Sequence, residues 1–133
     1  MFPTLFEKLN ALFASGRVLA SEEVLREFEK VEKDEIYNWV KTHTGIFVPI
    51  DEPTQVVVAE ILEAFPKLLD TRTNRSGADP WVIAVAQVKG CTVVTHESLT
   101  GRPQRPNIPD VCKARDIPWM GVLDVIKTEG WRI

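Results

Sequence analysis

The chain has 133 residues, a formal net charge of −3 at pH 7, 44% apolar residues and 26% charged residues. This size and balance are typical of one soluble globular domain, so we expect a single domain over residues 1–133. They exclude collagen-like, repeat and disordered chains, and the negative charge argues against broad non-specific wrapping of DNA. Apolar runs such as residues 82–88 are too short to span a bilayer, and the N-terminus lacks the pattern of a signal peptide.

The two cysteines, Cys91 and Cys112, have no zinc-site or redox-pair spacing. We expect two small buried hydrophobic side chains. Free thiols of this kind fit a reducing cytoplasm.

Hydrophobic periodicity predicts helices that alternate with short strands. The predicted helices cover residues 3–15, 22–31, 34 to about 45, 54–69, 80–89, 109–114 and a last segment from 122. The predicted strands cover residues 17–20, 46–50, 92–96 and about 117–120. Ser21 is expected to cap the second helix, and Pro66 to kink or stop the fourth. This alternation predicts an α/β fold with a parallel sheet covered by helices on both faces.

The common catalytic motifs are absent from the sequence, which has no dinucleotide-binding glycine pattern, P-loop or nucleophile elbow. The two histidines, His43 and His96, have no third ligand at metal spacing. Nothing indicates nucleophilic catalysis by Ser, Cys or His. Carboxylate chemistry is what remains.

Three acids follow or open elements near the predicted carboxyl ends of the strands, where ligands bind in open α/β sheets. Asp79 opens the helix at 80–89, Glu97 follows the strand at 92–96, and Glu27 lies on the helix after the first strand. Clustered carboxylates suit Mg²⁺ or Mn²⁺. Each acid also has a structural alternative: Asp79-Pro80 is a common helix start, Glu97 fits a surface turn, and Glu27 fits a solvated helix face.

Together these segments resemble the PIN-domain ribonucleases, which include the VapC-type toxins. Residues 21–27 match a Ser-to-Glu helix motif, Asp79 with "PWVIAVA" matches an Asp that opens a small-residue helix, and residues 95–97 match a Thr-x-Asp motif. A subgroup with "ADPW", "VVTHE" and a downstream "IPDVC" is closer still, and residues 108–112 read "IPDVC". The resemblance spans nearly the whole chain.

The resemblance implies a metal-dependent endoribonuclease that cuts RNA with metal-activated water. Glu27, Asp79 and Glu97 would hold Mg²⁺ or Mn²⁺. Supporting roles would fall to Thr95, which would orient the site, to Asp110 as an outer acid and to Ser21. Basic residues of the two polar loops would hold RNA phosphates or serve only as solubilising charges: Arg72, Arg75, Arg102 and Arg105. A cognate antitoxin and a homodimer are the expected protein partners.

Two features depart from the family pattern. Glu97 stands where the wider family has Asp, although the subgroup with "VVTHE" shares this Glu. The family also opens with a strand that ends in Asp and lies at the centre of a 3-2-1-4-5 sheet, whereas this chain starts at the next helix and Glu7 is no substitute. The resemblance therefore implies a three-layer α/β/α fold that is N-terminally truncated and lacks the central strand 1.

We accordingly expect an impaired VapC-like ribonuclease, or a non-catalytic PIN remnant that acts as a protein-binding module. An unrelated α/β regulatory module is a third, weaker interpretation. Three arrangements stay open for the gap in the sheet. The flanking strands close on each other, a second chain fills the gap, or the natural polypeptide is longer.

Overall fold

The computed structural model describes residues 3–30, 35–69, 78–102 and 104–131. Its α-helices are α1 (Pro3–Ala14), α2 (Glu22–Lys30), α3 (Glu35–Lys41), α4 (Glu52–Ala64), α5 (Asp79–Lys89), α6 (Ile108–Ala114) and α7 (Val122–Thr128). Two short 3-10 helices are η1 (Thr44–Ile46) and η2 (Pro66–Leu69). The strands are β1 (Ala20–Ser21), β2 (Phe47–Val48), β3 (Val93–Val94) and β4 (Trp119–Met120).

The strands form two separate parallel pairs, β1 with β2 and β3 with β4. Ala20 lies opposite Phe47 in the first pair, and Val93 lies opposite Trp119 in the second. The predicted alternation of helices with parallel strands is therefore confirmed. The predicted strand at 17–20 was placed too early, because the chain is paired only at Ala20–Ser21, where β2 runs beside it.

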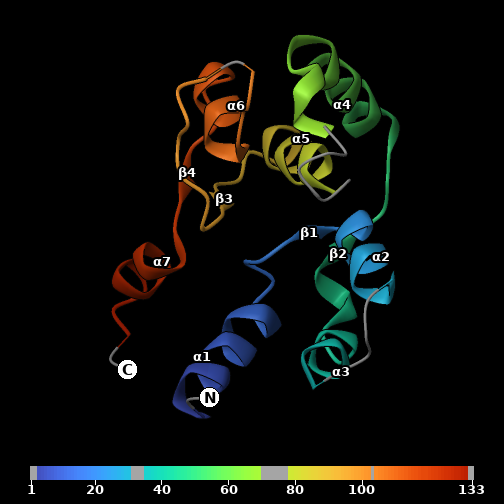
Figure 1. Cartoon of the computed structure of the whole chain (residues 1–133). Helices are drawn as coiled ribbons and strands as arrows, with labels where there is room; N and C mark the ends of the chain where they lie inside the picture. The colour runs from blue at the N-terminus through green and yellow to red at the C-terminus, as the bar shows by residue number, and fades with distance from the viewer. Residues whose placement is uncertain (1–2, 31–34, 70–77, 103, 132–133) are drawn as a thin grey trace.

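The hydrophobic core lies among α4, α5 and α6, which we call the central helices. Its fully buried side chains come from all three helices and include Ile61 of α4, Ile83 of α5 and Val111 of α6. Val93 of β3 and Ile117 before β4 join the same cluster. Figure 1 shows these helices together in the upper half of the molecule. Burial of large aliphatic side chains is the main source of folding free energy, so this region holds the fold.

Local signals explain where the central helices begin and end. The Asp51 carboxylate accepts a hydrogen bond from the Thr54 amide (2.9 Å), which caps the start of α4. The predicted helix at 54–69 ends at Ala64, and η2 follows from Pro66, as expected for a proline that cannot continue the helix. Gly90 ends α5 in the left-handed conformation (φ 69°), which glycine adopts without strain.

A single arginine joins the three central helices. Arg115, which follows α6, donates from Nε to Gln87 of α5 (2.7 Å) and from Nη2 to Glu60 of α4 (2.8 Å). Packing and polar contacts thus act on the same three helices.

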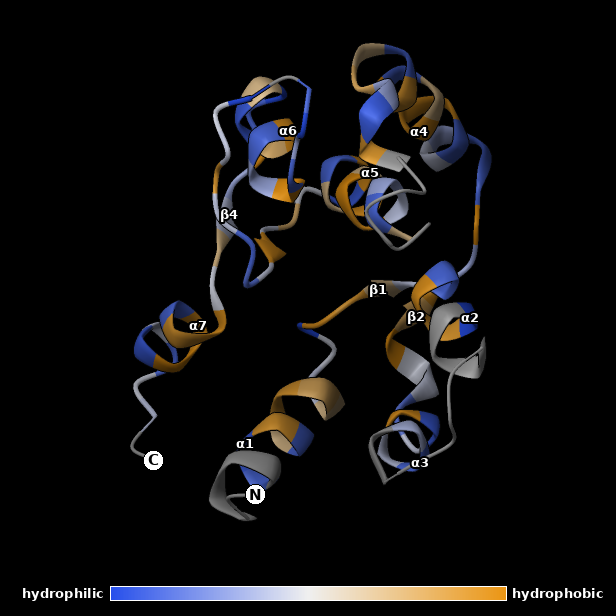
Figure 2. Ribbon diagram, viewed as in Figure 1, coloured by the Kyte–Doolittle hydropathy of each residue, from blue (hydrophilic) through white to orange (hydrophobic). Residues whose placement is uncertain are grey.

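We call α1 and α7 the outer helices. None of their described side chains is buried, and Leu123 of α7 is 72% exposed. Figure 2 shows apolar residues on both outer helices, which lie in the lower half of the molecule, away from the central helices. Asn10 of α1 bonds to two residues of the α3 region, with its Oδ1 lying 2.8 Å from both Trp39 Nε1 and His43 Nε2. Phe13 of α1 also packs against the rings of Trp39 and His43, with centroids 5.1 and 5.4 Å apart. The outer helices therefore make local contacts but add no buried residue to the core.

Across the described residues, no helix is long and apolar enough to cross a membrane.

Candidate functional site

Glu97 lies in a turn that directly follows β3. Thr95 Oγ1 accepts a hydrogen bond from the Glu97 amide (3.1 Å), which fixes the backbone of this turn. The Glu97 carboxylate is half-buried, and its Oε1 accepts from the Ile108 amide at the start of α6 (2.9 Å). The side chain is therefore held at the carboxyl end of the strand, where one of its oxygens already caps a helix.

Asp79 is the first residue of α5, with Ala78 as the N-cap residue and Pro80 in the first turn. The structural alternative for Asp79 was an N-cap one residue outside the helix, whereas Asp79 lies inside it. In the first turn the carboxylate still lies near the positive end of the helix dipole. The side chain is half-buried and interacts with its surroundings.

Ser21 ends β1 and is almost fully buried. Its hydroxyl accepts a hydrogen bond from the Glu23 amide (3.2 Å), as expected of the residue that caps α2. Glu27 lies on α2, but its side chain falls outside the described part of the structure. The structure thus shows the helix that carries Glu27 and the cap that starts it.

Asp110 organises the loop between β3 and α6. Its carboxylate accepts from the amides of Thr100, Gly101 and Asn107, over distances of 2.8 to 3.1 Å, and from the Thr100 hydroxyl. With Asn107 it forms a capping box for α6. Partial burial alone would raise the pKa of this carboxyl, but the amides of Asn107, Thr100 and Gly101 hold it below its ordinary value. The observed contacts of Asp110 are those of a structural acid.

The predicted phosphate-binding arginines divide into two pairs. Arg102 and Arg105 are exposed on the loop that Asp110 organises, and a turn joins them through the Arg105 amide and the Arg102 carbonyl (3.0 Å). Arg72 and Arg75 lie outside the described residues. The structure therefore places two exposed cations on the loop that follows Glu97.

The predicted metal ligands can be tested by whether their side chains come together. Carboxylate oxygens are the donors that Mg²⁺ and Mn²⁺ prefer. Over the residues with described side chains, however, no group of three or more His, Cys, Asp and Glu gathers closely enough to hold a metal ion. Asp79 and Glu97 therefore do not complete a metal site from the described side chains alone.

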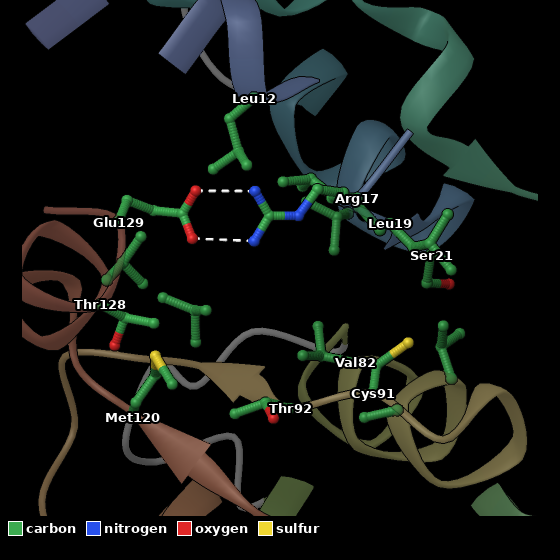
Figure 3. A pocket seen from close by; sticks show the side chains of 17 residues that line it. Leu12, Arg17, Leu19, Ser21, Val82, Cys91, Thr92, Met120, Thr128 and Glu129 are labelled. Carbon is green, nitrogen blue, oxygen red and sulfur yellow. Dashed lines mark hydrogen bonds and ion pairs between the residues drawn. The ribbon is translucent and has the colours of Figure 1, made fainter. Parts of the chain in front are cut away.

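A cavity of about 570 Å³ separates the two parallel strand pairs. Its walls come from residues 17–21 around β1 on one side and from Cys91, Thr92 and Val94 around β3 on the other. Val82, Val85 and Ala86 of α5 line it between these walls, and Leu12 of α1 and Val125 of α7 contribute from the outer helices. Figure 3 shows these side chains converging from both sides. We call this cavity the inter-strand pocket.

The inter-strand pocket is apolar apart from one ion pair and three hydroxyl residues, Ser21, Thr92 and Thr128. Arg17 donates from both Nη atoms to the two carboxylate oxygens of Glu129, at 2.7 and 2.8 Å (Figure 3). This two-pronged geometry is the strongest form of an arginine–carboxylate contact. The hydrogen bonds and charge of Glu129 raise the pKa of Arg17, and those of Arg17 lower the pKa of Glu129.

Sequence reasoning missed both the inter-strand pocket and the Arg17–Glu129 pair. The two residues are 112 positions apart, and no local motif joins them. The resemblance to the PIN family implied a gap between the strands at 17–20 and 92–96, but nothing in the sequence indicated which side chains line it.

The comparisons with known proteins give one match. The family model described as "Domain of unknown function (DUF4411)" matches residues 1–133. No curated protein and no solved structure matches the chain.

Proposed function

Starting from the premise that the chain belongs to the DUF4411 family, we propose that it is a cytoplasmic, metal-dependent endoribonuclease of the PIN type. The proposed biological role is that of a VapC-like toxin held in check by an antitoxin. The proposal rests on the sequence motifs around Ser21, Asp79 and Glu97 together with the local geometry of these residues.

The observation that carries the proposal is the turn at Thr95–Glu97. The resemblance assigns Thr95 the task of orienting the site, and its hydroxyl does bond to the Glu97 amide at 3.1 Å. The carboxylate is thereby fixed beyond the carboxyl end of a parallel strand, where ligands bind in α/β sheets. A short polar turn of this kind can present an acid in one orientation.

The proposed sheet order extends this argument. The pairs β2–β1 and β3–β4 are separate in the structure, and we propose that they correspond to the two halves of one parallel sheet, with the inter-strand pocket between β1 and β3. In the proposed order 3-2-1-4-5, this pocket corresponds to the position of strand 1. The α/β character and the parallel pairing of the four strands support this assignment.

The proposed metal ligands are Glu27, Asp79 and Glu97. A bound Mg²⁺ or Mn²⁺ would supply an activated water and stabilise the oxygen displaced from phosphorus. The side chain of Glu27 lies outside the described part of the structure, so the described side chains supply two of these three ligands. Arg102 and Arg105 are the described cations proposed to hold the RNA backbone.

The test combines Mn²⁺ binding by calorimetry with cleavage of a fluorescent single-stranded RNA. Asp79→Asn and Glu97→Gln should each weaken Mn²⁺ binding and cleavage about tenfold or more, the scale seen when a supporting group of a metal site is lost. Glu97→Gln keeps an oxygen that can accept from the Ile108 amide, so it removes the charge while the helix cap remains.

Glu63→Gln is the matched control, because Glu63 is an exposed acid on α4 outside every motif used here. It should leave both quantities unchanged. Cleavage that persists in EDTA, or that survives both Asp79→Asn and Glu97→Gln, would reject the nuclease proposal.

The second candidate is a non-catalytic protein-binding module, and the inter-strand pocket favours it. Monomeric proteins seldom leave an apolar cavity open between strand edges unless something binds there. Metal binding that is the same in the wild type, Asp79→Asn and Glu97→Gln would favour this candidate over the nuclease.

A further inference from the structure

We propose that the inter-strand pocket binds an extended, uncharged apolar segment of a partner polypeptide, which pairs as a β-strand between β1 and β3. This inference deepens the protein-binding candidate, and it holds whether or not the chain cleaves RNA. Its support comes from the backbone of β3, the exposed side chains of the walls and the charge of the pocket.

The backbone of β3 is bonded along one edge, and the strand borders the pocket. The amides of Val93 and Thr95 donate to carbonyls around β4, those of Pro118 and Met120, both at 2.9 Å. Alternate residues of a strand bond to opposite neighbours, so the backbone groups of Val94 point away from β4. Val94 is also a lining residue of the pocket. Among the described residues, the second edge of β3 therefore has no backbone partner, and the strand borders the pocket at Val94.

The strand β1 is related to the pocket in a similar way. It pairs with β2, and among the described residues no backbone hydrogen bond joins β1 to β3. Residues 18–21 nevertheless line the pocket. A strand edge is a template for another strand, and here two edges border one cavity. A helix or a small ligand would leave these main-chain groups unmatched.

The side chains of the walls match an apolar occupant. Leu19 and Val94 line opposite sides of the pocket and are 40% and 49% exposed, although both are large hydrophobic residues. Val82 and Val85 of α5 add further apolar surface between them. Covering such surface removes it from water, which favours binding.

Charge complementarity selects against a charged occupant. The two charged residues of the lining, Arg17 and Glu129, neutralise each other through two short hydrogen bonds. The other polar lining residues are uncharged hydroxyl residues. A charged side chain brought into this neutral cavity would lose hydration without gaining a partner. The segment that binds is therefore uncharged over the pocket.

The two cysteines provide a direct measure of occupancy. Cys91 lines the pocket and is half-buried, whereas Cys112 is fully buried. Burial raises the pKa of the Cys112 thiol to about 11, so it reacts slowly at neutral pH. The rate of thiol labelling in the native protein therefore reports on Cys91.

The experiment measures Cys91 labelling of the full chain with and without a synthetic peptide. The peptide carries about five alternating valine and threonine residues between terminal lysines, with both ends blocked. At a peptide concentration about ten times the Kd, labelling should slow about tenfold. A peptide with proline at alternate central positions should give no protection, because proline cannot donate a main-chain hydrogen bond.

Amide hydrogen exchange identifies the mode of binding. The valine peptide should slow exchange of the Val94 amide, while the Val93 and Thr95 amides, already bonded toward β4, should stay unchanged. Leu19→Lys should abolish protection of Cys91 because it places a charge in the neutral pocket. Val56→Lys is the control, since Val56 is 52% exposed on α4 and lies outside the pocket lining.

Three results would overturn the proposal. The first is no protection of Cys91 at a peptide concentration of about 1 mM, where even weak binding is visible. The second is equal protection by the valine and proline peptides. The third is protection of Cys91 without peptide that grows with protein concentration alongside a dimer, which would make a second copy the occupant. None of these measurements contains RNA or metal, so failure here is separable from failure of the nuclease proposal.

Discussion

The central helices and the outer helices have similar amphipathic sequence patterns, but they differ in how far their apolar side chains are buried. Both groups have amphipathic helices with apolar residues at helical spacing. In the central helices these residues meet in one cluster, and Ile61, Ile83 and Val111 are fully buried. In α7 the residues Val122 and Leu123 are 50% and 72% exposed. The same kind of pattern thus stabilises one region and leaves the other open.

The polar contacts of the two regions also differ in what supports them. The Arg115–Glu60 pair lies over helices that already pack against each other. The Arg17–Glu129 pair lies beside the inter-strand pocket, where α7 has no buried residue. We infer that the Arg115–Glu60 pair reinforces helices that buried side chains already hold. The Arg17–Glu129 pair instead holds α7 where no buried side chain does so.

The largest expected effect compares a core residue with an exposed one. Ile83→Ala should lower the free energy of unfolding by about 2–5 kcal/mol, because it removes a fully buried side chain and leaves a cavity. Leu123→Ala on α7 should change it by less than about 0.5 kcal/mol. Urea denaturation of both variants measures the difference. Similar losses in the two variants would show that α7 is packed as firmly as α5.

The next prediction uses a motif that occurs in both regions. Asp110 and Asp124 both lie at the third residue of their helix, α6 and α7, and each carboxylate accepts from the amide of the N-cap residue, Asn107 (2.8 Å) or Gly121 (3.0 Å). Asp110→Ala should cost about 1–2 kcal/mol of stability, because three amides and a hydroxyl lose their acceptor. Asp124→Ala should cost less, because helix α7 contributes no buried residue to the fold. Thermal denaturation gives both values.

The pH dependence of Asp110 follows from its lowered pKa. Its contribution to stability is complete above the ordinary aspartate pKa of about 3.9 and is lost as the pH falls through the lower folded value. Asp110→Asn should therefore flatten the acid limb of the stability curve. If Asp110→Asn and the wild type lose stability identically at low pH, protonation of Asp110 is not the cause of the loss.

The sequence predicted the features that depend on neighbours in the chain. Helix periodicity located α4 and α5, and Pro66 marked the end of α4, because these signals act within one turn. The role of Asp110 was also readable, since Asn107 three residues before it is the spacing of a capping box. The match to "IPDVC" instead directed attention to an outer metal-site role.

The features that sequence reasoning missed depend on contacts across the fold. The Glu97 carboxylate bonds to an amide 11 residues later, and Arg17 bonds to a residue 112 positions away. The spacing of polar residues carries no information about such contacts. The prediction of parallel strands succeeded at the coarse level, because alternation with helices leaves few other arrangements. Which strand edges stay unpaired is decided by tertiary packing.

The smallest expected effect on global stability comes from removing either of the two ion pairs, which differ instead in their effect on local hydrogen exchange. Glu129→Gln should leave the unfolding midpoint nearly unchanged, because exposed ion pairs add little to stability. It should nevertheless speed hydrogen exchange of the α7 amides, since Arg17 is the described charged partner that holds this end of the helix. Glu60→Gln removes the matching pair of the central helices and should leave exchange in α4 and α5 unchanged, because buried side chains hold them.

Acid should reproduce the Glu129→Gln result in the wild type. The Arg17 hydrogen bonds lower the folded pKa of Glu129, so the pair is complete above the ordinary glutamate value of about 4.3 and is lost as the pH falls through the lower folded value. Over that range, α7 exchange corrected for its intrinsic pH dependence should rise in the wild type and stay flat in Glu129→Gln. If α7 exchange depends on pH in the same way in both proteins, apolar contacts hold α7. The proposed difference between the central and the outer helices would then be wrong.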